Sequence, residues 1–134
     1  MTNVIVTVEM TDNNYSAYIE SLPGCVTTGK SMDEMKANMQ EAIEGHIEIS
    51  REFGDKIPEE FEGEYSLTFR FDAESLLTHY KGIFTNSALE RLTGINQRQL
   101  QRYASGKSCP MKPQQVKIQK ALHRLGEELL EVEL

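Results

Sequence analysis

Glutamine and arginine side chains recur at helical spacing in the segment 97–104, which reads QRQLQRYA. Leu100 and Tyr103 lie three positions apart and predict the buried side of a helix, so the polar residues between them would face outward. In the major groove of DNA, glutamine pairs with adenine and arginine pairs with guanine through two hydrogen bonds. The four side chains expected to read base edges are Gln97, Arg98, Gln101 and Arg102.

Capping and turn residues around this segment indicate a helix-turn-helix. Thr85 is expected to cap a helix over 87–92, and Asn96 is expected to cap the next one, which runs to about Ser105. Gly94 lies between them and permits the left-handed backbone of a tight helix–helix turn. The apolar residues expected to hold the two helices together are Leu89, Leu92, Ile95, Leu100 and Tyr103.

Polar residues at the ends of these helices are suited to the DNA backbone, since phosphate contacts position a protein on the duplex. This set contains Thr85, Asn86 and Lys107, and Asn96 joins the expected DNA-binding residues as the cap of the second helix. Glu90 departs from the pattern, because the motif usually has alanine against the following helix at this point. Glu90 either points outward or changes the angle between the helices. A solvated polar helix in a small bundle is the alternative interpretation, since glutamine and arginine also form helices well.

Charge is divided unequally along the chain, although the total is only −7. Residues 1–74 hold sixteen acidic and five basic residues, a net charge of −11. Residues 75–126 hold nine basic residues against the single acid Glu90. A basic surface attracts phosphate polyanions, whereas an acidic surface repels them and attracts basic proteins. We therefore expect nucleic-acid binding in the second half and a basic protein partner for the first.

Alternating apolar residues in the acidic half predict strands over 4–10, 15–20 and 65–71, with a short strand over 25–28. Ser31 and Glu34 form a capping box that starts a helix of about five turns, which Gly54 ends. One helix then covers one face of a mostly antiparallel sheet. Its apolar side is expected to hold Met32, Met35, Met39, Ile43, His46, Ile47 and Phe53, and its other side Glu41, Glu44, Glu48 and Glu52.

The remaining helices are expected over 75–81 and 114–132. The end of the last helix, at Leu129, Leu130 and Val132, has more apolar area than a monomer needs, so we expect a dimer seam there. The fold class is α+β, with a β-β-β-α-β domain over 1–74 followed by an all-helical domain over 75–134.

Catalytic and metal chemistry find little support in the sequence. Cys25 and Cys109 form no paired-cysteine motif and are expected to be reduced thiols, and three scattered histidines supply no zinc site. No apolar run approaches the ~20 residues of a membrane span, and the first residues lack a secretory signal. We therefore expect a cytoplasmic protein that is not an enzyme and that needs no metal or cofactor.

Two segments resemble known families. The segment YSAYIESLPGCVTTGKSMDEMKANMQEAIEGHIE is similar to the HicB antitoxin domain, with its aromatic strand, LPGC corner, G-x-S helix start and long helix. The segment ALERLTGINQRQLQRYASGKSCP resembles the helix-turn-helix of the Cro and phage-repressor type, which follows many HicB domains. Both segments stand in the order of the family.

The resemblance implies a truncated, non-catalytic ribonuclease-H-like core that binds and blocks a small basic toxin similar to HicA, an mRNA-cleaving ribonuclease. It also implies that the second domain binds operator DNA as a dimer and represses its own operon. Charge alone makes Glu41, Glu44 and Glu48 candidates for toxin contact. The alternative is a one-component regulator whose first domain senses a small ligand. A third, minor reading is a metal-dependent nuclease that uses Glu9, Glu20 and Asp72.

Overall fold

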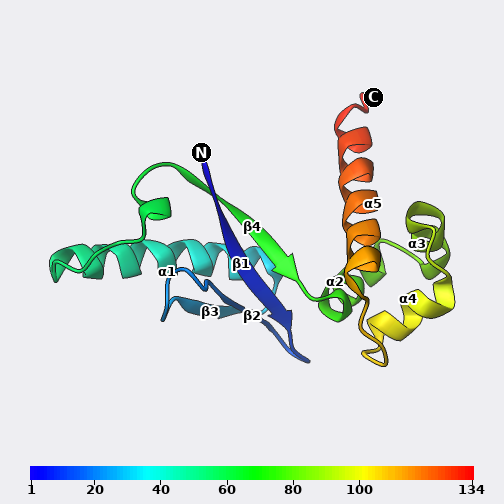
Figure 1. Cartoon of the computed structure of the whole chain (residues 1–134), viewed down its shortest axis with the longest axis horizontal. Coiled ribbons are helices and arrows are strands. Elements are labelled where there is room, and N and C mark those ends of the chain that lie inside the picture. The colour runs from blue at the N-terminus through cyan, green and yellow to red at the C-terminus, as the bar shows by residue number, and fades with distance from the viewer. The chain divides into compact units, whose positions relative to one another are not determined.

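The computed structural model covers every residue of the chain and divides into two units along the sequence (Figure 1). The first unit, Met1–Asp72, joins a four-stranded sheet to one long helix. The second unit, Ala73–Leu134, contains helices and no strand. The predicted α+β class and the predicted β-β-β-α-β order are confirmed. The division falls two residues before the expected boundary, because a helix already begins at Ala73.

The sheet of the first unit has the strand order β3-β2-β1-β4. Strand β1 (Thr2–Met10) pairs antiparallel with β2 (Tyr15–Tyr18), which pairs antiparallel with β3 (Val26–Gly29). Strand β4 (Tyr65–Phe71) lies on the other side of β1 and runs parallel to it. A parallel pair needs a long crossover, and here the chain between β3 and β4 includes the long helix.

The corner between β2 and β3 is tighter than the alternating pattern predicts. The strand expected over 15–20 ends at Tyr18, because the chain turns immediately afterwards. The Ile19 N–H donates to the Cys25 carbonyl at 3.3 Å, and the Leu22 N–H donates to the Ile19 carbonyl at 3.2 Å. These bonds close the LPGC corner and shift β3 one residue later than expected.

Helix α1 (Met32–Glu52) covers one face of the sheet over β2 and β3. The predicted cap is confirmed, since the Ser31 hydroxyl accepts a hydrogen bond from the Glu34 N–H at 3.1 Å. The prediction for Phe53 is wrong: this side chain is 75% exposed. Phe53 follows the last helical turn, at the end of α1 that extends past the sheet (Figure 1). The helix buries Met35, Met39 and Ile43.

The core of the first unit lies between α1 and the sheet. Val4, Val6 and Val8 on β1 are fully buried. In the parallel register Val4 lies opposite Leu67 and Val6 lies opposite Phe69, so β4 turns its apolar residues to the same face. The apolar residues of β4 are nevertheless only half-buried, because α1 packs mainly over β2 and β3, toward the opposite edge of the same face. A short 3₁₀ turn at Glu59–Phe61 adds Phe61 to this core.

The second unit consists of α2 (Ala73–His79), α3 (Asn86–Thr93), α4 (Gln97–Ala104) and α5 (Lys112–Leu130), with a 3₁₀ turn at Tyr80–Gly82. Helix α5 starts two residues earlier than expected, since proline is tolerated in the first turn of a helix. No helix of the chain combines the length and the apolar character that a membrane span requires. The core of this unit contains Leu77, Leu89, Ile95, Leu100, Tyr103 and Ile118, whereas Leu92 is only half-buried.

Candidate nucleic-acid and partner surfaces

Two side-chain caps and one glycine form the turn between α3 and α4 in the second unit. The Thr85 hydroxyl accepts from the Ala88 N–H at 3.0 Å and starts α3. The Asn96 side-chain oxygen accepts from the Arg98 N–H at 2.8 Å and starts α4. Gly94 ends α3 with φ 76°, a left-handed conformation that favours glycine. The predicted caps and the predicted turn are therefore confirmed.

Helix α4 separates its apolar and polar residues cleanly. Leu100 and Tyr103 are buried, and both pack in the core of the second unit. The polar residues Gln97, Arg98, Gln101 and Arg102 lie on the exposed side of the helix. The exposed residues that the sequence predicted for DNA contact are Thr85, Asn96, Gln97, Arg98, Gln101, Arg102 and Lys107.

Two hydrogen bonds tie the predicted base-reading glutamines to α3. The Asn86 amide donates to the Gln101 carbonyl oxygen at 2.8 Å. The Gln97 amide donates to the Glu90 carboxylate at 2.8 Å. Glu90 therefore points outward to the first turn of α4. Sequence reasoning missed both bonds, because the partners stand fifteen and seven positions apart on different helices.

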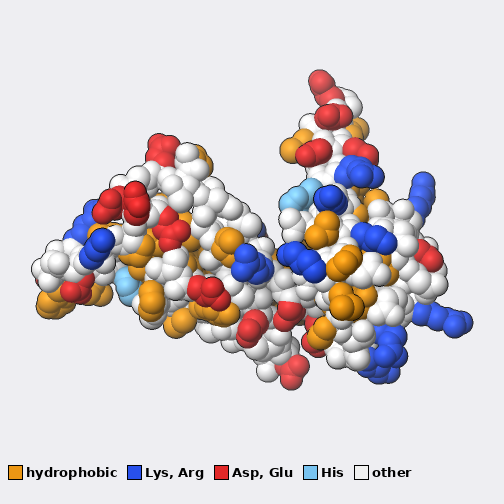
Figure 2. All heavy atoms as spheres, viewed as in Figure 1, with side chains coloured by type: hydrophobic (Ala, Val, Ile, Leu, Met, Phe, Trp, Pro, Cys, Tyr) orange, Lys and Arg blue, Asp and Glu red, His pale blue; other side chains and the backbone are white.

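The surface charge follows the division into units. Figure 2 shows lysine and arginine side chains gathered over the second unit and acidic side chains over the first. Acidic side chains return near the C-terminal end of α5. A helix surface with arginine and lysine at exposed positions suits a polyanion such as DNA.

An acidic stripe runs along the solvent side of α1. Glu41, Glu44 and Glu48 are all exposed and recur at spacings of three and four. Gln40 donates from its amide to the Glu44 carboxylate at 3.1 Å and to the Tyr65 hydroxyl at 3.4 Å. The three carboxylates are therefore exposed together on one helix.

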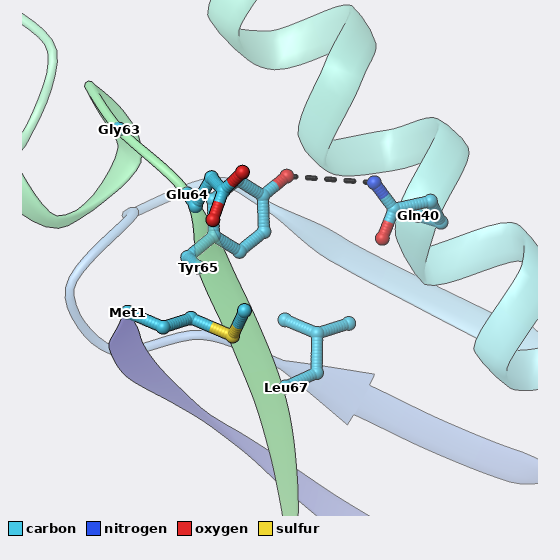
Figure 3. A pocket seen from close by; sticks show the side chains of 6 residues that line it. All are labelled: Met1, Gln40, Gly63, Glu64, Tyr65 and Leu67. Atoms are coloured by element: carbon cyan, nitrogen blue, oxygen red, sulfur yellow. Dashed lines mark hydrogen bonds between the residues drawn. The ribbon is translucent and has the colours of Figure 1, made fainter.

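A hollow of about 460 Å³ lies between α1 and the start of β4 (Figure 3). Gln40 reaches into it from the helix, and Tyr65 and Leu67 reach into it from the strand. It is open to solvent on one side. The other lining residues are Met1, Gly63 and Glu64.

No group of three or more histidine, cysteine, aspartate or glutamate side chains converges as a metal site would require. Glu9, Glu20 and Asp72 belong to no such group. His46 is half-buried and packs beside the LPGC corner at Gly24. Burial raises the pKa of the Cys25 thiol, which packs 3.9 Å from the Met39 sulfur and stays protonated.

Comparison with known proteins shows relatives for the first unit. Residues 4–67 match the model of HicB-like antitoxins of bacterial toxin–antitoxin systems. A UPF0150 protein of Thermoplasma acidophilum is 40% identical over 47 residues, which are 35% of this chain and 68% of the relative.

UPF0150 proteins of two further organisms match over shorter stretches. The protein of Archaeoglobus fulgidus is 41% identical over 44 residues, or 33% of this chain and 64% of the relative. The protein of Helicobacter pylori is 46% identical over 40 residues, or 30% of this chain and 56% of the relative. The family match ends before the second unit begins.

Proposed function

The chain belongs to the UPF0150 family and carries a HicB-like antitoxin domain over residues 4–67, and from this premise we propose that it is the antitoxin of a type II toxin–antitoxin pair. The antitoxin binds and blocks a small basic mRNA-cleaving toxin similar to HicA. The observation that carries the proposal is the coincidence of that domain with a segment of net charge −11. Such a surface attracts a basic RNA-binding protein and repels RNA itself.

The acidic stripe on α1 is the proposed toxin surface. Glu41, Glu44 and Glu48 are exposed on one helix, so they can face a basic groove together. Carboxylates at this spacing offer the toxin the kind of charge that RNA phosphates offer. Inhibition is then by occupation of the RNA site and needs no catalysis by the antitoxin.

The second unit is the proposed operator-binding domain. Helix α4 enters the major groove, where Arg98 and Arg102 read guanine and Gln97 and Gln101 read adjacent bases. Thr85, Asn96 and Lys107 contact the DNA backbone at the ends of the motif. Binding at the promoter of its own operon represses the antitoxin and the toxin together.

A dimer is part of this proposal, because operators of this class are read as two half-sites. The end of α5 offers an apolar seam. Leu129 is 61% exposed, Leu130 is 88% exposed and Val132 is 64% exposed. Exposed apolar residues gathered at one helix end are typical of an interface with a second copy.

Sensing of a small ligand is the competing function, and it would need an enclosing pocket. The hollow between α1 and β4 is open to solvent. An open hollow leaves most of a small ligand in water, so it favours a protein partner over a metabolite.

Co-expression with the neighbouring gene tests the proposal. A small basic protein encoded beside this chain should stop growth alone, and this chain should restore growth and co-purify with it. If no neighbour is toxic and none co-purifies, the antitoxin function is wrong.

Two triple charge-reversal variants, one on the stripe and one as a control, test the proposed toxin surface in the growth-rescue assay. Glu41→Lys, Glu44→Lys and Glu48→Lys combined should abolish growth rescue, because three repulsive charges would face a basic toxin. The matched control reverses Asp55, Glu59 and Glu62, which are exposed in the loop after α1. The control should retain rescue. Equal loss in both triple variants would mean that total charge matters and the stripe does not.

A further inference from the structure

The two edges of the sheet differ in length and protection. Edge strand β3 has four residues and is too short to recruit another strand firmly. Edge strand β4 has seven residues, YSLTFRF, with neither proline nor glycine and with Arg70 as its one charged side chain. Proteins normally shield a long edge strand with several charges, a proline, a bulge or a covering segment. Strand β4 lacks the first three.

The apolar side of β4 is also incompletely covered. Tyr65, Leu67 and Phe69 are half-buried, since α1 packs over β2 and β3. Two long polar side chains of α1 reach across instead. The Lys36 ammonium lies 4.9 Å from the centre of the Phe69 ring, and Gln40 bonds the Tyr65 hydroxyl at 3.4 Å. The open hollow in Figure 3 lies along the same row.

We propose that β4 is a self-pairing edge, where a second copy of this chain adds its own β4 in antiparallel orientation about Leu67. The pairing joins two four-stranded sheets into one continuous sheet. A two-fold axis perpendicular to the sheet keeps α1 of both copies on the same side. The backbone groups along the outer edge of β4 then gain partners, and each apolar row extends the other.

The side-chain pattern selects this register. Pairing about Leu67 sets Tyr65 opposite Phe69 of the second copy, an aromatic pair of the kind that stabilises sheets. It also sets Glu64 opposite Arg70 of the second copy, so that two opposite charges meet at each end of the contact.

Neighbouring registers fit less well. A slip by one residue would place the apolar side chains of one β4 on the same face as the polar side chains of the other β4. A slip by two residues, to pairing about Thr68, would set Glu64 opposite Asp72 of the second copy, and like charges that face each other are destabilising. Between Glu64 and Arg70, the register about Leu67 keeps both apolar rows on one face of the sheet and sets no like charges opposite each other.

A second copy fits this edge better than a basic partner does. The charges along the contact are one acid, Glu64, and one base, Arg70, and they complement each other across a two-fold axis. The acidic stripe of α1, by contrast, lies on the solvent side of the helix and carries charge of one sign. The edge is therefore self-complementary, and the inference does not depend on toxin or DNA binding.

Disulfide trapping tests the pairing. In the proposed register Ser66 lies opposite Thr68 of the second copy, whereas two copies of either residue are offset by two positions. Ser66→Cys and Thr68→Cys chains, both carrying Cys109→Ser, are co-expressed with different tags and then oxidised mildly. The mixed dimer should exceed either same-variant dimer by about tenfold, because a disulfide spans only a short Cα separation. Both positions are exposed, so the variants should fold.

The outcomes are decisive. Thr28→Cys on β3 is the control at the other edge of the sheet, because Thr28 is also exposed. This control should give no disulfide-linked dimer. If the mixed pair dimerises no more than Thr28→Cys, the pairing is wrong. If Thr68→Cys alone dimerises best, the proposed register is wrong. If trapping occurs only onto a different co-purifying protein, a second copy is the wrong occupant.

A charge swap gives a second readout. Arg70→Glu should reduce the trapped mixed dimer, and Glu64→Arg added to it should restore the yield. Arg51→Glu makes the same charge change at an exposed site at the end of α1 and should leave the yield unchanged. Failure of the double variant to restore the dimer would overturn the Glu64–Arg70 contact and the register with it.

Discussion

Arg98 and Arg102 carry the two guanidinium groups of α4, and both are exposed. If each reads a guanine, Arg98→Ala or Arg102→Ala should weaken operator binding by about 1–3 kcal/mol. Fluorescence anisotropy with the promoter DNA of the chain's own operon measures this. Lys117→Ala, on the exposed side of α5, is the control. If affinity is unchanged in both arginine variants, α4 does not read bases in the major groove.

Glu90 places a negative charge beside Gln97, the first residue of α4 that is proposed to read a base. Its bond to Gln97 restricts that side chain, and its charge opposes phosphate. If Gln97 reads a base, Glu90→Ala should therefore raise affinity for random DNA and reduce discrimination at that base. Selection from a random DNA pool measures both effects. Identical base preferences in the variant and the natural chain would contradict the role of Glu90.

The two cysteines differ in accessibility, and this gives a test of the fold. Cys109 is exposed and Cys25 is buried, with a raised pKa. A thiol reagent should modify one cysteine per folded chain and both after denaturation. The buried thiol keeps its proton when the unfolded thiol loses it, so stability should fall as pH rises above the ordinary thiol pKa of 9.0. Rapid modification of both cysteines in the folded chain would contradict the packing of Cys25.

At the scale of elements, two glycines of the first unit predict opposite effects of the same substitution. A Cβ on Gly29 would lie 2.5 Å from the backbone nitrogen of Met35, so Gly29→Ala must push α1 away from β3. The expected loss of stability is about 1–3 kcal/mol. A Cβ on Gly45 meets nothing within 4 Å, and this residue lies inside α1.

Gly45→Ala should therefore stabilise the first unit by about 0.5–1 kcal/mol, the usual gain inside a helix. Urea unfolding of both variants checks the pair. A tolerated Gly29→Ala would mean that α1 is not held as closely to β3 as the structure shows.

Local signals made most elements predictable. The sequence predicted the helix caps and the turn glycine correctly, because each depends on residues within four positions. These residues are Ser31, Thr85, Asn96 and Gly94. Strand alternation also depends on near neighbours, so the β-β-β-α-β order followed from it.

Features that depend on contacts between residues far apart in the sequence could not be predicted from the sequence. The half-burial of Leu67 and Phe69 depends on where α1 crosses the sheet, which no short pattern encodes. Phe53 has the correct spacing for the core but lies past the end of the sheet. The Gln97–Glu90 bond depends on the geometry between two helices.

At the scale of the whole molecule, the uneven charge predicts a strong salt effect despite the negative total. Phosphate contacts release counterions, so operator affinity should fall steeply with salt, with a log–log slope of about −0.9 for each contact. Lys107→Ala should reduce the slope by about one unit. Titrations at several potassium chloride concentrations measure it. A flat response would mean that the basic second unit does not contact phosphates.

The parallel pairing of β1 with β4 has a consequence for synthesis of the chain. Strand β1 pairs with β2 soon after it leaves the ribosome, but its other neighbour is translated roughly 60 residues later. At about 5–20 residues per second, that delay lasts several seconds. During this interval one edge of β1, with its valines, stands open in the nascent chain. The first unit can close only after β4 has been made, when about half of the chain has been translated, so its sheet is completed well after β1 and β2 have paired.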